Sequence, residues 1–440
     1  MKRVLFEYLP YWLLLIIFGL IVLHAPLIVV VGSHWPSLAL GIKAWKELLM
    51  IIALVLLAVA VTQRGQWQTL LKDNLIRLML AFAVLHGGIA LLKPVAWQSL
   101  VAGLSIDLRY LLYFCLVYVF LTLYPRYKQQ FITIGIAGAL VVLGFTCLQL
   151  VLPHDALKYL GYSSATIEPY ITVDKNPDFV RFNSTLRGPN PLGAYALIVL
   201  VGVVAFGMKY GRTVRDQRIR WLHLFLAVGS IVALWVSYSR SAWIGAAVGI
   251  LTVVGTRYGK HLDAKKWSVV AVFTVLLVVG SLLLKDSSFF RTVILHDSPT
   301  TGATIDSNTA HAASLGDGLS RMLAQPLGSG VGSTGSASLM GGEPLIIENH
   351  YLFVAHEVGW LGLGLFISIM IVTLRRLWAR RADWLALTLF GSGIGLSVVG
   401  LLLPVWVDDT VSIIWWGMAA VILAKGEMHG TTNKKATRTA

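Results

Sequence analysis

Long apolar stretches occupy most of this chain and constrain its fold more than any other feature. Of its 440 residues, 57% are hydrophobic and 13% are charged, whereas soluble domains carry about 25% charged residues. A stretch of about 20 apolar residues is long enough to cross the hydrocarbon core of a bilayer as a helix. The sequence therefore predicts an all-α, polytopic integral membrane protein.

We expect about twelve transmembrane helices, the first of them retained because it is too long for a signal peptide. The segment 94–106 is ambiguous, since it could form a re-entrant or interfacial piece before the fourth helix. The two cysteines lie in apolar stretches, so we expect no disulfide framework. The predicted spans are residues 11–31, 47–62, 76–92, 107–124, 129–152, 188–208, 220–237, 241–256, 267–284, 350–374, 383–403 and 406–424.

The distribution of basic residues predicts the topology. Most of the 36 Lys and Arg fall on one set of predicted loops and on both termini, which the positive-inside rule assigns to the cytoplasm. The net charge of +15 is therefore explained by topology, and we expect no nucleic-acid partner. The chain divides into amino-terminal helices (1–152), core helices with a first long outer loop (153–284), a large outer, periplasmic loop (285–349), carboxy-terminal helices (350–424) and a basic cytoplasmic tail (425–440).

The first outer loop ends in a motif that favours anion binding. Gly188 and Pro189 force a turn, and Pro191 suits the start of a helix. The amide end of that helix together with Arg187 predicts an anion site at the membrane surface, and Arg can contact phosphate with two hydrogen bonds. The alternative is an ordinary helix start at which Arg187 snorkels to the interface.

A second outer corner, residues 237–243, is a very short turn between two predicted helices. It holds Arg240 close to the hydrocarbon, where an unpaired guanidinium is costly. We expect a ligand phosphate or a carboxylate, Glu348 or Asp317, to satisfy it. Other basic residues expected at the outer face, able to extend a cationic surface or to snorkel, are Lys43, Lys46 and Arg109.

A polar cluster of Glu348, Asn349 and His350 stands where the large outer loop meets an apolar helix. An imidazole with a near-neutral pKa suits proton transfer at such a boundary. The alternative is that Glu348 and Asn349 cap the helix and that His350 is an interface residue.

The large outer loop itself, residues 285–349, is rich in Gly, Ser and Thr, so we expect a partly mobile loop more than a folded domain. Its glycines at 328, 330 and 332 would allow backbone amides to approach a ligand.

Several motifs of metal and nucleotide enzymes are missing from the sequence. There is no phosphate-binding Gly-x-x-x-x-Gly-Lys-Ser/Thr, no His-Glu-x-x-His and no Asp-x-Asp pair, and Asp408 and Asp409 are adjacent rather than spaced. We therefore expect neither a metal nor another cofactor, and we expect the activation energy of a donor substrate to reside in a lipid.

Taken in order, the outer motifs resemble those of the bacterial O-antigen ligase and O-antigen polymerase superfamily. The resemblance covers about residues 180–365, and it departs from the usual His-Asn-x-Tyr-Leu of the family because Asn349 precedes His350 here. The matching segments are RGPNPLG at 187–193, SRSAW at 239–243, PLGSG at 326–330 and ENHYL at 348–352, followed by Glu357, Val358, Gly359, Gly362 and Leu363.

The resemblance implies a membrane glycosyltransferase of the GT-C class, metal-independent and inverting, at the periplasmic face of the bacterial inner membrane. Such an enzyme transfers a glycan from undecaprenyl diphosphate to an acceptor hydroxyl. The acceptor is lipid A-core in O-antigen ligases of lipopolysaccharide biosynthesis, which we favour, or another lipid-linked glycan in O-antigen or polysaccharide polymerases. From other classes, a secondary transporter or a flippase for lipid-linked sugars remains an alternative.

The chemistry of such a transfer assigns roles to the motif residues. His350 is the expected catalytic residue, either as the base that accepts the proton of the acceptor hydroxyl or, protonated, as a ligand of the diphosphate. Preorganised cations stabilise the leaving diphosphate. The expected substrate- and diphosphate-binding residues are Arg187, Arg240, Asn190, Glu348 and Asn349.

Overall fold

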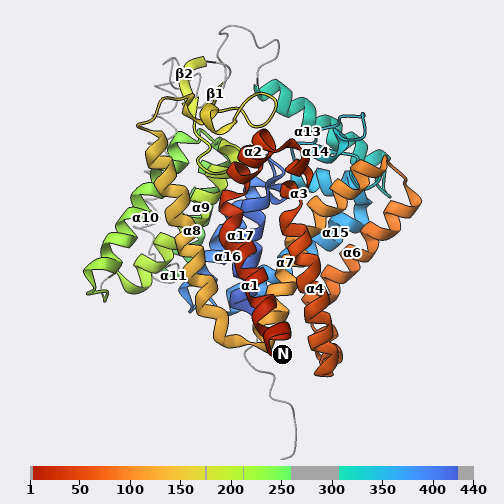
Figure 1. The fold of residues 1–440 in the computed structure, drawn as a ribbon, viewed down its shortest axis with the longest axis horizontal. Coiled ribbons are helices and arrows are strands. Elements are labelled where there is room, and N and C mark those ends of the chain that lie inside the picture. Colours follow the sequence, from red (N-terminus) through yellow and green to blue (C-terminus); the bar gives the residue numbers. More distant parts are fainter. Residues whose placement is uncertain (1–2, 174–175, 212, 259–306, 425–440) are drawn as a thin grey trace, which may run out of the picture.

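The computed structural model describes residues 3–173, 176–211, 213–258 and 307–424, and it is mostly helical (Figure 1). Helices make up 77% of the structure and strands 2%. Eight of the described helical segments are long and apolar enough to cross a membrane, which confirms a membrane-embedded, all-α protein. They are Val4–His34, Trp45–Gln63, Asn74–Leu92, Trp97–Leu123, Pro125–Gln149, Pro189–Tyr210, Gln217–Val236 and His350–Ala379.

In element terms, the first segment contains α1 (Leu9–Leu20) and α2 (His24–His34), and the following ones are α4, α6, α7, α8 (Lys128–Gln149), α9, α10 and α15. Two shorter apolar helices, α16 (Trp384–Val399) and α17 (Asp409–Leu423), lie among them. The predicted span 267–284 and the predicted tail 425–440 lie outside the described residues. The number twelve therefore stays a prediction.

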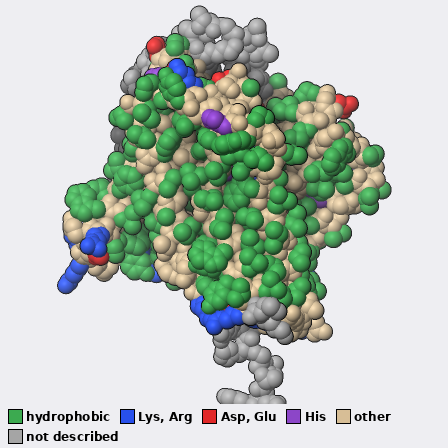
Figure 2. All heavy atoms as spheres, viewed as in Figure 1, with side chains coloured by type: hydrophobic (Ala, Val, Ile, Leu, Met, Phe, Trp, Pro, Cys, Tyr) green, Lys and Arg blue, Asp and Glu red, His purple; other side chains and the backbone are tan. Residues whose placement is uncertain are grey.

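The surface of the bundle has the character expected of a membrane protein. Figure 2 shows hydrophobic side chains covering the flank between the two ends, whereas Lys and Arg gather mainly toward the end that holds the amino terminus. Large apolar side chains on this flank are open to the surroundings, including Val84, which is 73% exposed, and Val55, which is 57% exposed. Burial in lipid rather than in protein explains so much exposed apolar area.

Helix α11 (Arg240–Tyr258) packs tightly between α9 and α16 because small residues face one another. A Cβ atom at Gly245 would lie 2.8 Å from the carbonyl oxygen of Gly395, so only glycine allows this approach of α11 to α16. A Cβ atom at Gly193 would likewise lie 2.8 Å from that of Ala242. The starts of α9 and α11 are therefore neighbours.

Consecutive long helices run in alternating directions, so the starts of α7, α9, α11, α15 and α17 share one end of the bundle (Figure 1). The same end carries the hairpin of β1 (Ile171–Val173) and β2 (Asn176–Arg181), and also α13 (Ser307–Ala324) and α14 (Gly335–Ser338). We call it the loop end. The amino terminus lies at the opposite end.

Two expectations about the loops are corrected. The described part of the large outer loop, residues 307–349, contains α13 and α14, and α13 packs against α15. Residues 97–106 form the first turns of α7 and not a re-entrant piece. Pro94 follows the end of α6 and separates the two helices, so the apolar stretch after it continues as one long helix.

Candidate functional site

His350 is the first residue of α15 and is held at the loop end by its neighbours. The side-chain oxygen of Asn349 accepts hydrogen bonds from the amides of Tyr351 and Leu352, at 2.9 and 3.0 Å, and its Nδ2 donates to the carbonyl of Leu401. Asn349 is thus the helix cap that the sequence allowed as an alternative. The amide of His350 donates to the Gly400 carbonyl at 2.8 Å, which joins α15 to the end of α16.

The imidazole of His350 is buried among aromatic rings. Its side chain lies 4.9 Å, centroid to centroid, from Phe366 and is stacked parallel to Phe353. The residue is 2% exposed, and within the described part of the chain neither ring nitrogen has a hydrogen-bond partner. Such a buried polar group is costly, and in native proteins it calls for a specific explanation.

Three further ionisable residues share this interior, and of these Glu357 also belongs to the segments that carry the family resemblance. The Nε2 atom of His86, on α6, lies 3.6 Å from the Asp107 Oδ2 atom, on α7. The carboxyl groups of Asp107 and Glu357, the latter on α15, are within hydrogen-bonding reach, and His350 interacts electrostatically with Asp107. We call His86, Asp107, His350 and Glu357 the buried carboxyl cluster. The signal that could have found it is an ionisable residue inside an apolar span.

Residues 326–342, which we call the glycine-rich segment, donate backbone hydrogen bonds to other parts of the protein. This corrects the expectation that their amides bind a ligand. Helix α15 is broken at Val358 and Gly359, so the carbonyls before the break lose their helical partners. The amides of Ser329 and Gly330 donate to the carbonyls of His356 and Glu357 instead, at 2.6 and 3.2 Å. These two hydrogen bonds replace the helical partners that the carbonyls lose at the break.

The same segment also holds the side chain of Glu357. The amide of Thr334 lies 3.4 Å from Glu357 Oε1 and donates to it. Backbone at Gly332 also donates to this carboxyl group. The glycine-rich segment therefore positions one member of the buried carboxyl cluster.

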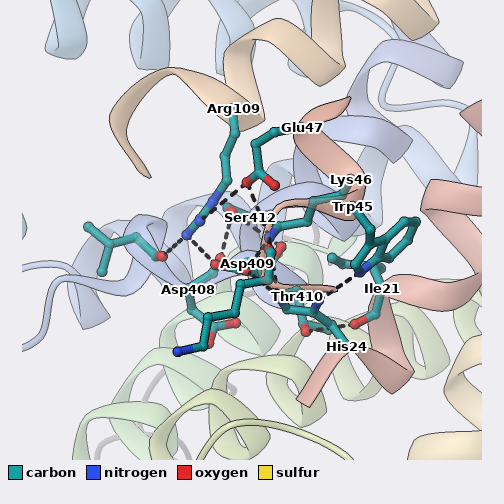
Figure 3. A network of polar contacts seen from close by, with 12 residues as sticks. Ile21, His24, Trp45, Lys46, Glu47, Arg109, Asp408, Asp409, Thr410 and Ser412 are labelled. Atoms are coloured by element: carbon teal, nitrogen blue, oxygen red, sulfur yellow. Dashed lines mark hydrogen bonds and ion pairs between the residues drawn. The ribbon is translucent and has the colours of Figure 1, made fainter. Parts of the chain in front are cut away.

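A second polar network is centred on Asp409 (Figure 3). The Asp409 carboxylate accepts hydrogen bonds from Lys46 Nζ at 2.8 Å and from His24 Nε2 at 2.9 Å, and it pairs with Arg109. Lys46 also contacts Glu47 at 3.1 Å. Lys46 and Arg109 are 2% and 7% exposed, so they neither extend a cationic surface nor snorkel. Burial beside a carboxylate is the reason.

Arg187 lies exposed near the start of α17. Burial, with the neighbouring Asp409, raises the pKa of Asp408 to about 6, and the nearby guanidinium groups of Arg109 and Arg187 act against this rise. Asp408 also caps α17, because its Oδ1 accepts the amide of Val411 at 2.9 Å. Arg187 therefore interacts electrostatically with Asp408, next to the network around Asp409.

Arg181 donates hydrogen bonds both to the segment that follows Arg187 and to the turn that precedes Arg240. Its Nη2 donates to Asn190 Oδ1 at 2.7 Å and its Nε donates to the Ser237 carbonyl at 2.9 Å. Asn190 thus serves an internal contact, and Arg240 is half-buried at the first residue of α11 beside it. The loop end brings the motifs of Arg187 and Arg240 side by side.

Two acidic residues were considered as partners of Arg240, and the structure describes contacts of both. The carboxylate of Asp317 pairs with Arg321 one turn later in α13, at 2.6 Å. The amide of Glu348 donates to the Ser314 hydroxyl at 3.2 Å, which fixes the start of α15 against α13, and its side chain is half-buried. Within the described ranges, no group of three or more His, Cys, Asp or Glu is arranged to hold a metal ion.

Comparison with models of known protein families gives no match, and comparison with curated proteins gives no significant relative. The fold and the apolar helices define the class: a helical protein embedded in a membrane, with ionisable side chains buried inside its bundle. A more specific function is argued from the site.

Proposed function

We propose that the protein is a membrane glycosyltransferase that moves a glycan from undecaprenyl diphosphate to an acceptor hydroxyl, as an O-antigen ligase does. One observation carries this proposal. Three motifs far apart in the sequence stand at helix starts on the loop end, where Arg187 precedes α9, Arg240 begins α11 and His350 begins α15. Helix starts present amide hydrogens and a partial positive charge, which favours bound anions.

The two arginines supply the charge that a departing diphosphate requires. As the glycosidic C–O bond breaks, negative charge grows on the diphosphate oxygens. Preorganised guanidinium groups stabilise that charge without rearranging during the reaction. Arg187 is exposed and Arg240 is half-buried, so both can meet a lipid headgroup at the membrane surface.

His350 supplies the proton acceptor. The oxygen of the acceptor hydroxyl attacks the anomeric carbon, its O–H bond breaks, and the proton moves to a ring nitrogen of His350. Direct displacement inverts the anomeric configuration. Both ring nitrogens lack partners among the described residues, so each keeps an unused hydrogen-bonding atom.

The proposed setting is the bacterial inner membrane, with both termini in the cytoplasm and the loop end in the periplasm. The Lys and Arg side chains near the amino-terminal end of the bundle support this orientation. Lipid A-core is the proposed acceptor, and another lipid-linked glycan is the acceptor if the protein is a polymerase.

Reconstitution in nanodiscs with a lipid-linked glycan and lipid A-core tests the proposal. We expect Arg187→Ala and Arg240→Ala to lower transfer by about 10²-fold or more, while Arg321→Ala, an exposed arginine of α13, keeps wild-type transfer. His350→Gln should abolish the reaction, and acidification should slow the wild type because a protonated imidazole cannot accept a proton. Transfer near the wild-type rate by Arg240→Ala would refute the role of the arginines.

A second candidate function is an ion-coupled secondary transporter. The observation that favours it is the burial of Lys46, Arg109 and Asp409 inside the bundle, since transporters carry ionisable residues there. Proteoliposomes separate the two candidates. Glycan transfer with donor and acceptor supplied on one side supports the enzyme, whereas uptake driven by a proton gradient, without transfer, supports the transporter. The same assay separates a flippase, which would move the donor without joining it to the acceptor.

A further inference from the structure

Asp107 and Glu357 bring two carboxyl groups into contact inside the bundle. They are 7% and 1% exposed, they come from α7 and α15, and they lie within hydrogen-bonding reach of each other. An ionised carboxylate only accepts hydrogen bonds, so a hydrogen bond between two carboxyl groups requires a proton on one of them. Two charged carboxylates side by side in an apolar interior would also repel strongly. A proton held by one of the two groups satisfies both conditions and leaves the pair with one negative charge.

The groups facing this pair come from every element around it. Helix α6 contributes His86, 3.6 Å from Asp107, and α7 contributes Tyr110, which interacts with Asp107 electrostatically. Arg109 follows Asp107 by two residues, about 200° around the helix, and it faces the network of Asp409 instead. The glycine-rich segment contributes backbone amides only. In the part of the chain that the structure describes, the remaining titratable neighbour is His350.

His350 and the pair each hold polar atoms that no hydrogen bond within the described chain uses. Among the described residues, Asp107 Oδ2, Glu357 Oε2 and both ring nitrogens of His350 lack hydrogen-bond partners. His350 is only 2% exposed, and its imidazole interacts electrostatically with the carboxyl group of Asp107. Atoms of this kind persist inside a membrane protein where they handle a substrate or a proton.

We propose that Asp107 and Glu357 form a proton-accepting pair that relieves His350 of the proton it takes from the acceptor hydroxyl. The N–H bond of the imidazolium breaks, the proton joins the ionised carboxylate, and His350 returns to its neutral form. The pair then carries two protons and no charge, and it returns one proton to solvent before the next turnover. The relay rests on the proposed transfer reaction, whereas the proton-holding pair does not.

Infrared spectroscopy of the full chain in nanodiscs at pH 7 tests the pair without any substrate. A protonated carboxyl group gives a C=O stretching band distinct from that of carboxylates. We expect such a band in the wild type. It should shift when ¹³C labels the side-chain type, aspartate or glutamate, that carries the proton. It should be lost in the double variant Asp107→Asn/Glu357→Gln. Asp317→Asn, which removes an exposed carboxylate of α13, should leave the band intact.

The proposal that Asp107 and Glu357 hold a proton is rejected if the wild type lacks the band. It is also rejected if the band is unchanged in a folded double variant. The isotope experiment needs no substitution, so poor folding of a variant cannot hide the answer. The amide variants also retain hydrogen-bonding atoms of nearly the same shape, which favours folding.

The relay is tested by steady-state transfer. Asp107→Asn and Glu357→Gln should each lower kcat by about 10²-fold, the range of acid–base catalysis, with KM nearly unchanged, and Glu357→Asp should restore part of the loss. A wild-type kcat in Asp107→Asn overturns the relay. If the wild type shows the band but no glycan transfer, the protonated pair is supported and the proposed function is rejected. If it shows transfer but no band, the proposed function is supported and the pair is rejected.

Discussion

Arg376 donates two hydrogen bonds to Asp73, from Nη2 to Oδ1 at 2.6 Å and from Nη1 to Oδ2 at 3.0 Å. The same carboxylate accepts the Tyr118 hydroxyl at 2.8 Å and the Leu75 amide at 2.9 Å. Asp73 thereby joins α6, α7 and α15 at the end opposite to the site. These three helices carry all four members of the buried carboxyl cluster, so Asp73 contributes to their alignment.

Asp73→Asn should therefore destabilise the protein although Asn can still cap α6. The substitution removes the charge that Arg376 pairs with, and breaking a largely buried pair costs about 2 to 4 kcal/mol. Thermal unfolding in nanodiscs measures the loss. The control is Asp155→Asn, since Asp155 is exposed and pairs only with its neighbour Lys158 in a surface turn. Equal stability of the two variants would contradict the role of Asp73.

The adjacent residues Asp408 and Asp409 should respond in opposite ways to the same substitution. Asp409→Asn leaves Lys46 and Arg109 buried with only Glu47 as a carboxylate partner, so we expect a loss of about 3 to 5 kcal/mol. Asp408→Asn retains a good helix cap and removes an unfavourable charge, so stability at pH 7 should hold or rise. Urea unfolding of both variants measures the contrast, and a larger loss in Asp408→Asn would contradict it.

Much of the helical architecture follows from local patterns. The predicted spans 47–62 and 76–92 agree with α4 and α6 within a few residues, because bilayer thickness sets the length of an apolar helix. Asn349 caps α15 by side-chain chemistry that is visible in the sequence. Helix α9 begins at Pro189, two residues before the expected start at Pro191, so the local signals located this helix start only to within two residues.

The polar interior could not be predicted, because its partners are distant in sequence. Nothing near Lys46 indicates that Asp409 is its partner, and the charged residue closest to Asp107 in the sequence, Arg109, pairs with Asp409 instead. The glycines indicate left-handed backbone, yet whether a ligand or another helix approaches them depends on tertiary packing. Only the assembled bundle decides these contacts.

Stability should also depend on pH through Asp408. Burial and the neighbouring Asp409 raise its pKa to about 6 in the folded protein, above the ordinary value of about 3.9. The folded state therefore binds the proton more tightly, so the contribution of Asp408 to stability falls as pH rises from about 4 to about 6. Melting temperatures of the wild type and Asp408→Asn across this range test the idea. Parallel curves for the two proteins would contradict it.

The glycine-rich segment allows a comparison of two glycines with similar backbone but different surroundings. Gly332 and Gly342 have φ values of +84° and +79°, so alanine at either costs about 1 to 2 kcal/mol in conformation alone. A Cβ atom at Gly332 would lie 2.1 Å from the Ser99 carbonyl oxygen, whereas nothing lies within 4 Å at Gly342. Gly332→Ala should lose about 1 to 3 kcal/mol more than Gly342→Ala, because the segment must move away from α7.

That movement also reaches the site. The Thr334 amide, two residues after Gly332, donates to Glu357, so its displacement removes a hydrogen bond that positions the carboxyl pair. We expect Gly332→Ala to lower transfer more than Gly342→Ala at a temperature where both variants are folded. Thermal unfolding in nanodiscs gives the difference in stability, and transfer assays on the same samples give the difference in activity. If the two variants lose equal stability and equal transfer activity, the requirement for glycine at position 332 comes from its backbone conformation and not from its contact with α7.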